Sequence, residues 1–484
     1  MRVLASFAAL LGASLLLPFP RAMAQGLPDL GDVSGGVLAP QVERRVGESI
    51  VREIRFRDPN YVDDAEIADY LNTLGYRLVS ASPGARQDFE FFAIRDASIN
   101  AFALPGGFVG VHTGLLTASE SESELASVLA HEIAHVTQRH IARLLSQQQQ
   151  LTLPTMIALA AAILAARSRP DLAIGAATAA QAGAVQSQLN YTRDFEREAD
   201  RLGFGTLASA GFDVHAMSSF FEKMQRFSRV NDDGSVPGYL RTHPVTTERI
   251  ADVQSRAAGM PYRQHLDSLE YHLVRAKLRA EQSDARDAVT HFASSVRDGR
   301  YANESAARYG LVTALLRAKE AGAADAEMVR LRATGAASPM IEMLAARVQQ
   351  AAGNHAAALA ILRQGLTRFP HRRPIVYAYV SALQNTGGND EALSVLQDQL
   401  RLHPRDPRLF ELQAKTYAAL GKRLLQHRSL AEVYQLHGSL PAAIEQLQLA
   451  RSAGDGNFYE LSVIDARLKD LRTLHAEELK DMRR

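Results

Sequence analysis

The stretch "VLAHEIAHVTQRH", residues 128–140, places two histidines four positions apart and a glutamate directly after the first of them. Just upstream, Ser121 and Glu124 have the spacing of a capping box, which is typical of the start of a helix. Apolar residues then recur at helical spacing and predict a buried stripe of Leu125, Val128, Leu129, Ile133 and Val136. We therefore predict one helix that begins near residue 121 and carries all three polar side chains.

On such a helix His131 and His135 lie one turn apart on the same face, close enough to bind one metal ion. Glu132 lies about 100° further round, so it cannot be an equal third ligand but can reach a water molecule on that ion. Catalytic zinc takes neutral imidazoles, keeps a position open and lowers the pKa of its water to about 7. A glutamate beside that water can take its proton. The alternative is a pair of ordinary histidines.

A catalytic zinc site needs a third protein ligand. A metzincin would supply it with a histidine at position 141 and a glycine at 138, but this chain has Ile141 and Gln138, which excludes that arrangement. His140 lies off the ligand face of the predicted helix, and we interpret it as a solvated residue. The third ligand must therefore come from elsewhere in the chain.

A second helical segment, "NYTRDFEREADRLG" (190–203), carries Glu196 and Asp200 four positions apart. A glutamate at one turn can bind zinc, while an aspartate at the next turn accepts the outer N–H of a ligating histidine and fixes its tautomer. The alternative is a charged helix face exposed to solvent, which is what a mixture of acids and bases usually forms. The segment alone leaves both interpretations open.

The residues ahead of the metal motif predict two amphipathic helices, around 50–54 and 67–78, and then a small sheet. The runs 88–96 and 99–116 are rich in aromatic and β-branched residues, and the second contains the turn sequence Pro105-Gly106-Gly107. We expect one sheet edge to hold an extended substrate through backbone hydrogen bonds along Asn100, Ala101, Phe102 and Ala103. Such binding would give a loose sequence preference.

After about residue 263 the strand patterns disappear and a repeat of 34 residues begins, with Gly353, Gly387 and Gly421 in phase. Pro370 and Pro404 keep the same spacing. This period, with small and apolar residues repeating in step, is typical of tetratricopeptide repeats. We expect roughly four to six helical pairs with degenerate ends that present a concave surface to other proteins. The alternative is a plain helical bundle.

The first 24 residues have the pattern of a cleaved secretory signal: Arg2, an apolar run over 3–17 and Ala22-Met23-Ala24 ahead of Gln25. The mature chain would start near Gln25. The alternative, an uncleaved anchor, is weaker because the run is shorter than the roughly 20 residues of a bilayer span. The chain has no cysteine, hence no disulfide framework and no cysteine for lipid attachment, and we expect it in the periplasm.

The amino-acid composition limits the number of domains and the kinds of partner that we expect. The chain has 484 residues, 46% of them hydrophobic, enough for two or three domains with full cores. Its 54 basic and 53 acidic residues nearly balance, which argues against nucleic acid as a partner. The alanine-rich segment 153–185 has an apolar part too short to span a bilayer. We interpret it as an exposed flap with peripheral membrane contact, and the alternative is a buried helical hairpin.

Four ordered motifs together resemble the zinc metallopeptidases of the HtpX type: HEIAH (131–135), "INAFALPGG" (99–107), the segment with Glu196 and Asp200, and "THPVTTERI" (242–250). The secreted branch of that family carries tetratricopeptide repeats, and the resemblance covers nearly the whole mature chain. It implies an α+β, mainly helical protein. A zincin-like metallopeptidase domain with a small sheet (25–262) would follow the signal peptide (1–24) and precede an all-α repeat solenoid (263–484).

The resemblance also assigns roles to residues. It makes Glu132 the catalytic base and Asp200 the partner of a ligating histidine, and it leaves the neighbouring Glu198 without a role. The ligands that it implies for one Zn²⁺ per chain are His131, His135 and Glu196.

A later segment, "VNDDGSVPGYLRTHP" (230–244), is rich in Gly, Asp and Pro, as a movable loop should be. The resemblance implies that His243 in this loop takes the metal position that water would use and holds the enzyme latent. His243 could instead stabilise the oxyanion or only pack beside Pro244. Arg249, which matches an arginine of the family, is expected to orient carboxylates or substrate carbonyls.

The function that the resemblance implies is a periplasmic zinc endopeptidase, with or without chaperone activity, in the assembly and quality control of outer-membrane proteins. Its substrates would be misfolded or stalled outer-membrane proteins, and its repeats would contact the β-barrel assembly machinery. The alternative function is a non-catalytic repeat chaperone or adaptor with a latent or structural zinc site. The two functions predict different results when Glu132 is replaced by glutamine. The enzyme would lose cleavage but keep zinc, whereas the adaptor would keep its function.

Overall fold

The computed structural model describes residues 39–146, 182–230, 239–240 and 243–483. The expectations for the signal peptide (1–24), for most of the segment 153–185 and for most of the loop ahead of His243 lie outside these residues. The described helices of the first half are α1 (Pro40–Arg57), α2 (Ala65–Ala81), α3 (Thr113–Ala118), α4 (Glu122–Thr137), α5 (His140–Ser146), α7 (Ala182–Ser209), α8 (His215–Val230) and α10 (Thr247–Ala258).

The predicted sheet is confirmed. Strands β1 (Glu90–Ile94), β2 (Ala101–Leu104) and β3 (Phe108–His112) form, within the described residues, one three-stranded sheet in the order β1-β3-β2. The turn 105–107 joins β2 to β3 as an antiparallel pair, and Gly107 takes φ of 101° there. A side chain on Gly107 would meet the carbonyl oxygen of Asp88 at 2.2 Å, so only glycine fits. Because β2 stands last in the order β1-β3-β2, it forms an edge of this sheet.

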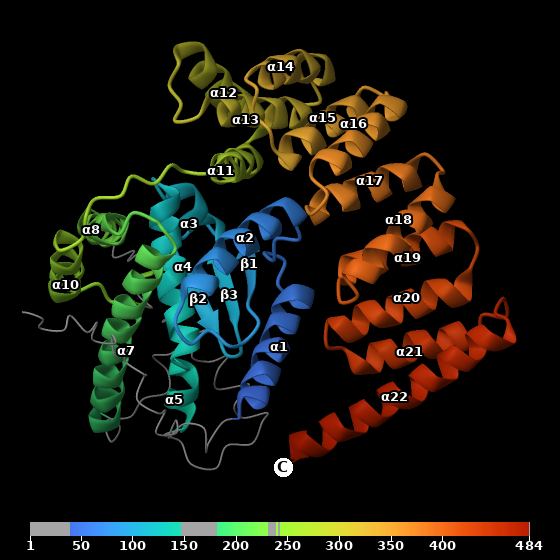
Figure 1. Cartoon of the computed structure of the whole chain (residues 1–484), viewed down its shortest axis with the longest axis horizontal. Coiled ribbons are helices and arrows are strands. Elements are labelled where there is room, and N and C mark those ends of the chain that lie inside the picture. Colours follow the sequence, from blue (N-terminus) through green and yellow to red (C-terminus); the bar gives the residue numbers. More distant parts are fainter. Residues whose placement is uncertain (1–38, 147–181, 231–238, 241–242, 484) are drawn as a thin grey trace, which may run out of the picture.

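Helix α4 is the centre of the first half, and Figure 1 shows it between the sheet and α7. Ser121 caps it by accepting a hydrogen bond from the backbone N–H of Glu124 at 3.2 Å, as predicted. The Glu124 carboxylate reaches back past Ser121 and accepts from the backbone N–H of Glu120 at 2.7 Å, and it also pairs with Lys223 of α8. The predicted stripe is too narrow, because every residue from Glu122 to Val136 is buried. Neighbouring elements surround the helix, so its polar residues face the interior.

The crossing of α4 and α7 depends on one glycine. At Gly203 an added Cβ would lie 3.0 Å from the backbone nitrogen of His131 and 3.1 Å from its Cα. At Gly205, on the exposed side of α7, an added Cβ would meet nothing within 4 Å. Gly203 thus permits the close helix approach that brings Glu196 and Asp200 towards the histidines of α4.

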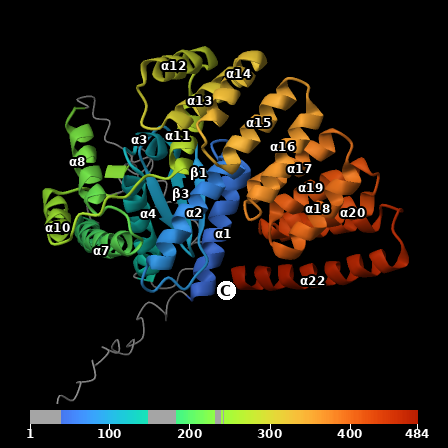
Figure 2. The same cartoon turned by 45° about the horizontal axis from the view of Figure 1, so that its top comes forward.

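The second half is an all-α solenoid of paired helices, which confirms the predicted repeats (Figures 1 and 2). The glycines at 353, 387 and 421 have φ between 69° and 80°, so each supplies the left-handed turn between paired helices. The six pairs are α11 (Leu269–Gln282) with α12 (Ala285–Asp298), α13 (Glu304–Arg317) with α14 (Ala321–Ala333), α15 (Pro339–Ala351) with α16 (His355–Arg368), α17 (Arg373–Asn385) with α18 (Asn389–Leu402), α19 (Pro407–Ala419) with α20 (Arg423–Leu436) and α21 (Leu440–Arg451) with α22 (Phe458–Arg483). None of the described helices is long and apolar enough to cross a membrane.

The solenoid begins inside the core of the first half. One continuous hydrophobic cluster runs from Val62 to Val348 and includes the fully buried Tyr271 of α11. The Tyr271 hydroxyl donates to the carbonyl oxygen of Ser119 at 2.9 Å. Lys277, 2% exposed, pairs with the carboxylates of Asp64 and Glu66 at the start of α2. Removing α11 would therefore expose a core face and take away the cation that faces the buried Glu66.

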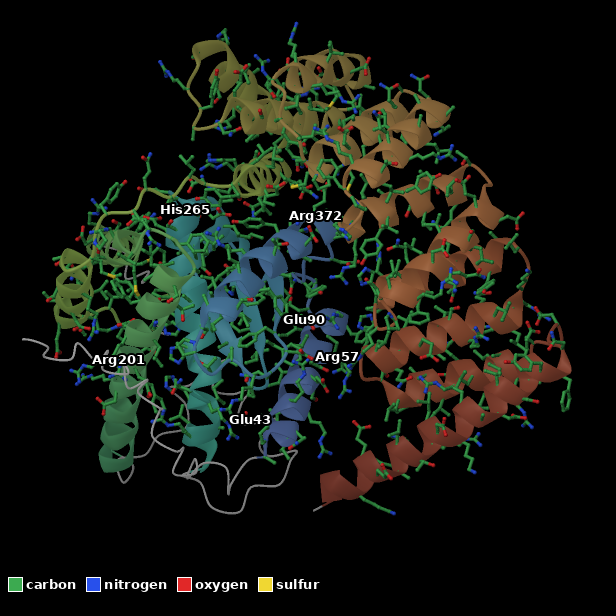
Figure 3. The ribbon with its side chains drawn as sticks, viewed as in Figure 1. Glu43, Arg57, Glu90, Arg201, His265 and Arg372 are labelled. Atoms are coloured by element: carbon green, nitrogen blue, oxygen red, sulfur yellow. The ribbon has the colours of Figure 1, made fainter. Side chains whose placement is uncertain are left out.

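Later repeats contact the first half again. Arg372, labelled in Figure 3 beside α2, pairs with Asp69 at 3.1 Å. Further along, Nη1 of Arg55 in α1 lies 2.9 Å from Nδ1 of His437, and the His437 ring packs edge-on against Phe56. The arc of helices therefore touches α2 and then α1, and the two halves of the chain are joined at several separate points.

Candidate metal centre

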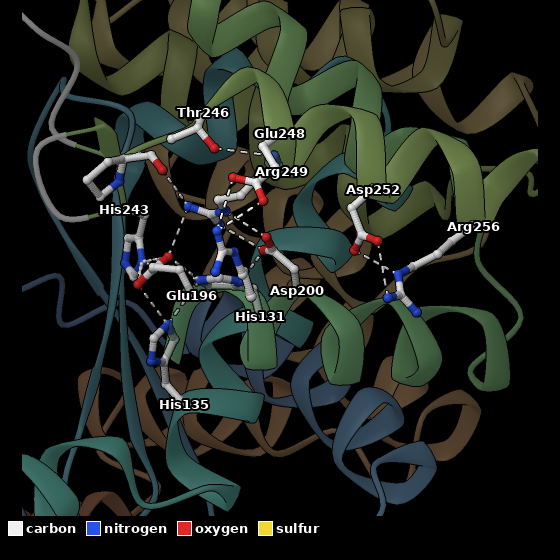
Figure 4. Close-up of polar contacts among 12 residues, drawn as sticks. His131, His135, Glu196, Asp200, His243, Thr246, Glu248, Arg249, Asp252 and Arg256 are labelled. Atoms are coloured by element: carbon white, nitrogen blue, oxygen red, sulfur yellow. Dashed lines mark hydrogen bonds and ion pairs between the residues drawn. The ribbon is translucent and has the colours of Figure 1, made fainter. Parts of the chain in front are cut away.

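Four side chains from three parts of the chain meet beside α4: His131, His135, Glu196 and His243, each offering a ligand atom within 4.8 Å of the others. The Nε2 atoms of His131 and His135 are 3.0 Å apart. The Glu196 carboxylate of α7 lies 3.3 Å from Nε2 of His131 and 3.4 Å from Nε2 of His135 (Figure 4). All four side chains are buried.

These distances fit a bound metal ion. Zinc holds nitrogen and oxygen donors at about 2.0–2.1 Å, and tetrahedral geometry then places the donors about 3.3 Å from one another. The measured separations of 3.0–3.4 Å among His131, His135 and Glu196 already have that spacing. Two imidazoles and one carboxylate are also a donor set that catalytic zinc uses. The residues present therefore fit a metal.

Asp200 and Arg249 hold the His131 side of the cluster. Oδ1 of Asp200 lies 3.0 Å from Nδ1 of His131, on the ring edge away from the other donors. Arg249 donates to both oxygens of Asp200, at 2.6 and 2.8 Å, and its Nη1 lies 3.1 Å from Glu196. Burial favours a raised pKa for Asp200, but the hydrogen bonds from Arg249 and His131 lower it. Arg249 thus orients two carboxylates and keeps them ionised.

The two histidines of α4 differ in charge. Burial lowers the pKa of His135 to about 4 despite its contact with Glu196. Burial acts on His131 in the same direction, but hydrogen bonds to Asp200 and Glu196 outweigh it and raise the pKa to about 9. Without a metal, His131 therefore carries a proton at neutral pH that a metal must displace.

His243 fills the fourth corner of the cluster. Its Nδ1 lies 3.0 Å from both oxygens of Glu196 and 3.3 Å from Nε2 of His131. Its Nε2 lies 3.3 Å from Oε1 of Glu132, which is 1% exposed. The ring stacks on Tyr239, with centroids 4.9 Å apart, and its backbone N–H donates to the Tyr239 carbonyl. Sequence reasoning did not identify Tyr239 as part of the site. Its position four residues before His243 is the local signal that could have indicated this contact.

Strand β2 reaches the same place. Asn100, Ala101 and Ala103 are buried and Phe102 is half-buried. A narrow pocket beside the cluster is lined by residues of β2, α4 and α7, among them Ala103, Glu132, His135 and Glu196. The strand expected to hold substrate therefore lies next to the expected catalytic base, although its use by a substrate stays a prediction.

The interpretation of His140 as a solvated residue is wrong. Its side chain is 2% exposed, and its ring stacks on Phe195 with centroids 4.2 Å apart. The reason is a break in the helix: α4 ends at Thr137, Arg139 takes the left-handed φ of 55°, and α5 starts afresh at His140. The new helix turns His140 inwards, which continuation of α4 would not have done.

His140 lies directly behind a member of the cluster. Its Nδ1 is 2.8 Å from Nδ1 of His135, and its Nε2 is 3.3 Å from Oε2 of Glu198. Arg143 donates to the same Glu198 oxygen at 2.9 Å. Glu198 therefore has contacts that the sequence did not reveal. The spacing of these residues in the sequence could not predict the contacts, because the contacts depend on the break in the helix at Arg139.

Comparisons with known proteins agree with this fold and site. Residues 66–257 match Peptidase family M48, and residues 350–416 match a tetratricopeptide repeat. The fold and site thus define a metallopeptidase joined to tetratricopeptide repeats. Among solved structures, YrrB, a TPR protein, matches 38% of this chain and 93% of its own chain at 17% identity, with a TM-score of 0.28.

The relatives are more specific. The chain is 34% identical over 457 residues to the Beta-barrel assembly-enhancing protease of Escherichia coli (strain K12), covering 93% of this chain and 92% of that protein. It is 40% identical over 307 residues to the Putative beta-barrel assembly-enhancing protease of Vibrio cholerae, covering 63% of each chain. The chain belongs to the beta-barrel assembly-enhancing protease family of M48 metalloendopeptidases.

Proposed function

We propose that this chain is a periplasmic zinc endopeptidase that cleaves misassembled outer-membrane proteins. The observation that carries the proposal is the convergence of His131, His135 and Glu196 at tetrahedral spacing beside Glu132. The names of the relatives support β-barrel assembly as the process. The secretory pattern of residues 1–24 supports the periplasm.

In this proposal His131, His135 and Glu196 hold one Zn²⁺ per chain. Imidazole and carboxylate donors in a buried tetrahedral arrangement suit zinc. When bound, zinc polarises the substrate carbonyl and makes water more acidic. Asp200 keeps a proton on Nδ1 of His131, so Nε2 of that ring is left as the donor that faces the metal. Arg249 fixes Asp200 and Glu196 at once.

Glu132 acts as the general base in this proposal. It follows a ligand directly in α4, and the helix turns its carboxylate to the side of the cluster where His243 lies. It takes the proton of the attacking water and then passes it to the leaving amine. Burial of this side chain strengthens its interaction with a nearby positive charge, because little water screens it.

His243 acts as a regulatory residue. Its ring stands at the fourth corner and also contacts Glu132, so water and substrate can enter only after it moves. Arg249 links this segment to the cluster, because its Nη1 donates to the carbonyl oxygen of Pro244 at 2.8 Å. The structure would then correspond to a latent form. Release of the His243 segment would activate it.

Recognition of partners is divided between the two halves. The edge strand β2 holds extended substrate through its backbone at Asn100–Ala103. The repeats dock on the outer-membrane β-barrel assembly machinery, since such solenoids present concave surfaces to other proteins. The segment 153–185 provides a peripheral membrane contact.

A Glu132→Gln variant tests this function. We expect it to bind one zinc ion per chain and to cleave an unfolded outer-membrane protein about 10²–10⁴-fold more slowly, because the proton acceptor is gone while all ligands remain. Glu248→Gln, on the exposed start of α10, serves as the control. If the Glu132 variant supports outer-membrane assembly in cells as well as the native chain does, the adaptor alternative is correct instead.

A further inference from the structure

The two histidines of α4 have different partners behind them. Nδ1 of His131 meets the carboxylate of Asp200 at 3.0 Å. Nδ1 of His135 meets another imidazole, Nδ1 of His140, at 2.8 Å. Two ring nitrogens at that distance share one hydrogen, so one ring donates and the other accepts. Which of them donates decides whether His135 can bind a metal through Nε2.

The chain of contacts beyond His140 fixes the direction. Nε2 of His140 lies 3.3 Å from Oε2 of Glu198, an acceptor when ionised, so His140 carries its hydrogen on Nε2. Nδ1 of neutral His140 is then an acceptor. It receives the Nδ1 hydrogen of His135, and Nε2 of His135 is left with a free lone pair. That atom is the one 3.4 Å from Glu196.

We propose that His140 and Glu198 are positioning residues that fix the tautomer and the ring orientation of His135 for metal binding. The inference rests on the proposed metal site. It makes His140 a relay between His135 and the carboxylate of Glu198 in α7. Behind His131 stands the carboxylate of Asp200, which accepts from Arg249. Behind His135, through His140, stands the carboxylate of Glu198, which accepts from Arg143.

The local structure holds His140 for this role. Stacking on Phe195 sets the plane of the ring, and Arg143 lies 4.5 Å above the same Phe195 ring. The left-handed Arg139 that starts the turn pairs with Glu43 of α1 at 3.0 Å. A non-glycine residue in this conformation is strained and persists only where its surroundings hold it. The turn at Arg139 thus directs the imidazole of His140 towards His135.

The competing explanation is that His140 only fills space. Two substitutions separate packing from hydrogen bonding. His140→Phe keeps a planar ring that stacks on Phe195 but has no acceptor for His135. His140→Asn loses the ring but can place its carbonyl oxygen where Nδ1 stands. Glu198→Leu removes the far end of the relay and leaves the His140 ring in place.

The experiment measures zinc affinity of the full mature chain by competition with a coloured chelator, and the absorption spectrum of the Co²⁺-substituted protein. Loss of a residue that orients a metal ligand lowers affinity about 10–100-fold. We expect that loss and a changed Co²⁺ spectrum in His140→Phe, recovery of most of the affinity in His140→Asn, and a weakened affinity in Glu198→Leu.

The results that overturn the relay differ from those that overturn the metal site. Native affinity in His140→Phe, or lower affinity in His140→Asn than in His140→Phe, would show that the residue only packs. If His140→Phe does not fold, Glu198→Leu decides, and an unchanged zinc affinity there rejects the relay. A native chain that binds no zinc would instead reject the proposed function.

Discussion

Nε2 of His243 lies 3.3 Å from Oε1 of Glu132, while Nδ1 of the same ring lies 3.0 Å from Glu196. One imidazole therefore spans the proposed base and a proposed ligand. An attacking water would need the same place, between the metal and Glu132. In the proposed function, the residue that completes the cluster in this structure would thus obstruct hydrolysis.

Replacing His243 with alanine is expected to raise the cleavage rate. If nine-tenths of the molecules hold His243 at the cluster, its removal raises activity about tenfold by making all of them competent. The measurement is the initial rate on an unfolded outer-membrane protein, with His291→Ala, on the exposed surface of α12, as the control. A rate that falls instead would assign His243 to oxyanion stabilisation.

Gly203 and Gly205 make a matched pair on α7. Gly203→Ala is expected to destabilise the fold by about 1–3 kcal/mol, because the new methyl overpacks against the backbone of His131. It should also lower zinc affinity, since the helices that supply the ligands move apart. Gly205→Ala should stabilise the chain by about 0.5–1 kcal/mol through helix propensity. Thermal unfolding and zinc titration of both variants test this pair, and equal effects would contradict the proposed crossing.

Metal uptake is expected to release a proton. At pH 7 the metal-free protein carries a charged His131, whose pKa is raised to about 9, and a neutral His135, whose pKa is lowered to about 4. Zinc therefore displaces about one proton from His131, and affinity rises roughly tenfold per pH unit until the pH passes that pKa. Calorimetry in two buffers of different ionisation enthalpy counts the protons. The same count at pH 7 and pH 10 would disagree with this assignment.

A chain that ends at residue 262 is expected not to fold. It lacks α11, whose Tyr271 fills the core and whose Lys277 neutralises Asp64 and Glu66. Loss of one partner from a buried ion pair costs about 3–5 kcal/mol. Circular dichroism on heating makes the test, with a chain that ends at residue 353 as the comparison because it keeps this core. Cooperative unfolding of the shorter chain at the native temperature would show that the two halves are independent.

Local patterns predicted much of the fold. The metal-binding motif, its helix and the small sheet follow from spacing that one helix or one hairpin imposes on the chain. The repeat was visible because Gly353, Gly387 and Gly421 each stand where the backbone must be left-handed. These features depend on residues close in sequence, so a single chain reveals them.

Long-range features were not predictable in the same way. Whether Glu196 lay in an exposed face or beside the histidines could not be decided from its own helix. The role of His140 depended on one strained residue, Arg139, that interrupts an apparently continuous helix. The contact of Arg55 with His437 joins residues far apart in the chain, and no local pattern encodes it.

The central claim is that one zinc ion binds where His131, His135 and Glu196 converge. Crystals of the zinc-loaded chain, measured on both sides of the zinc absorption edge, locate the ion directly by its anomalous scattering. The account requires one peak about 2.0–2.2 Å from Nε2 of both histidines and from an oxygen of Glu196. A peak without Glu196 in contact, or no peak at this position in a chain that cleaves protein, would contradict it.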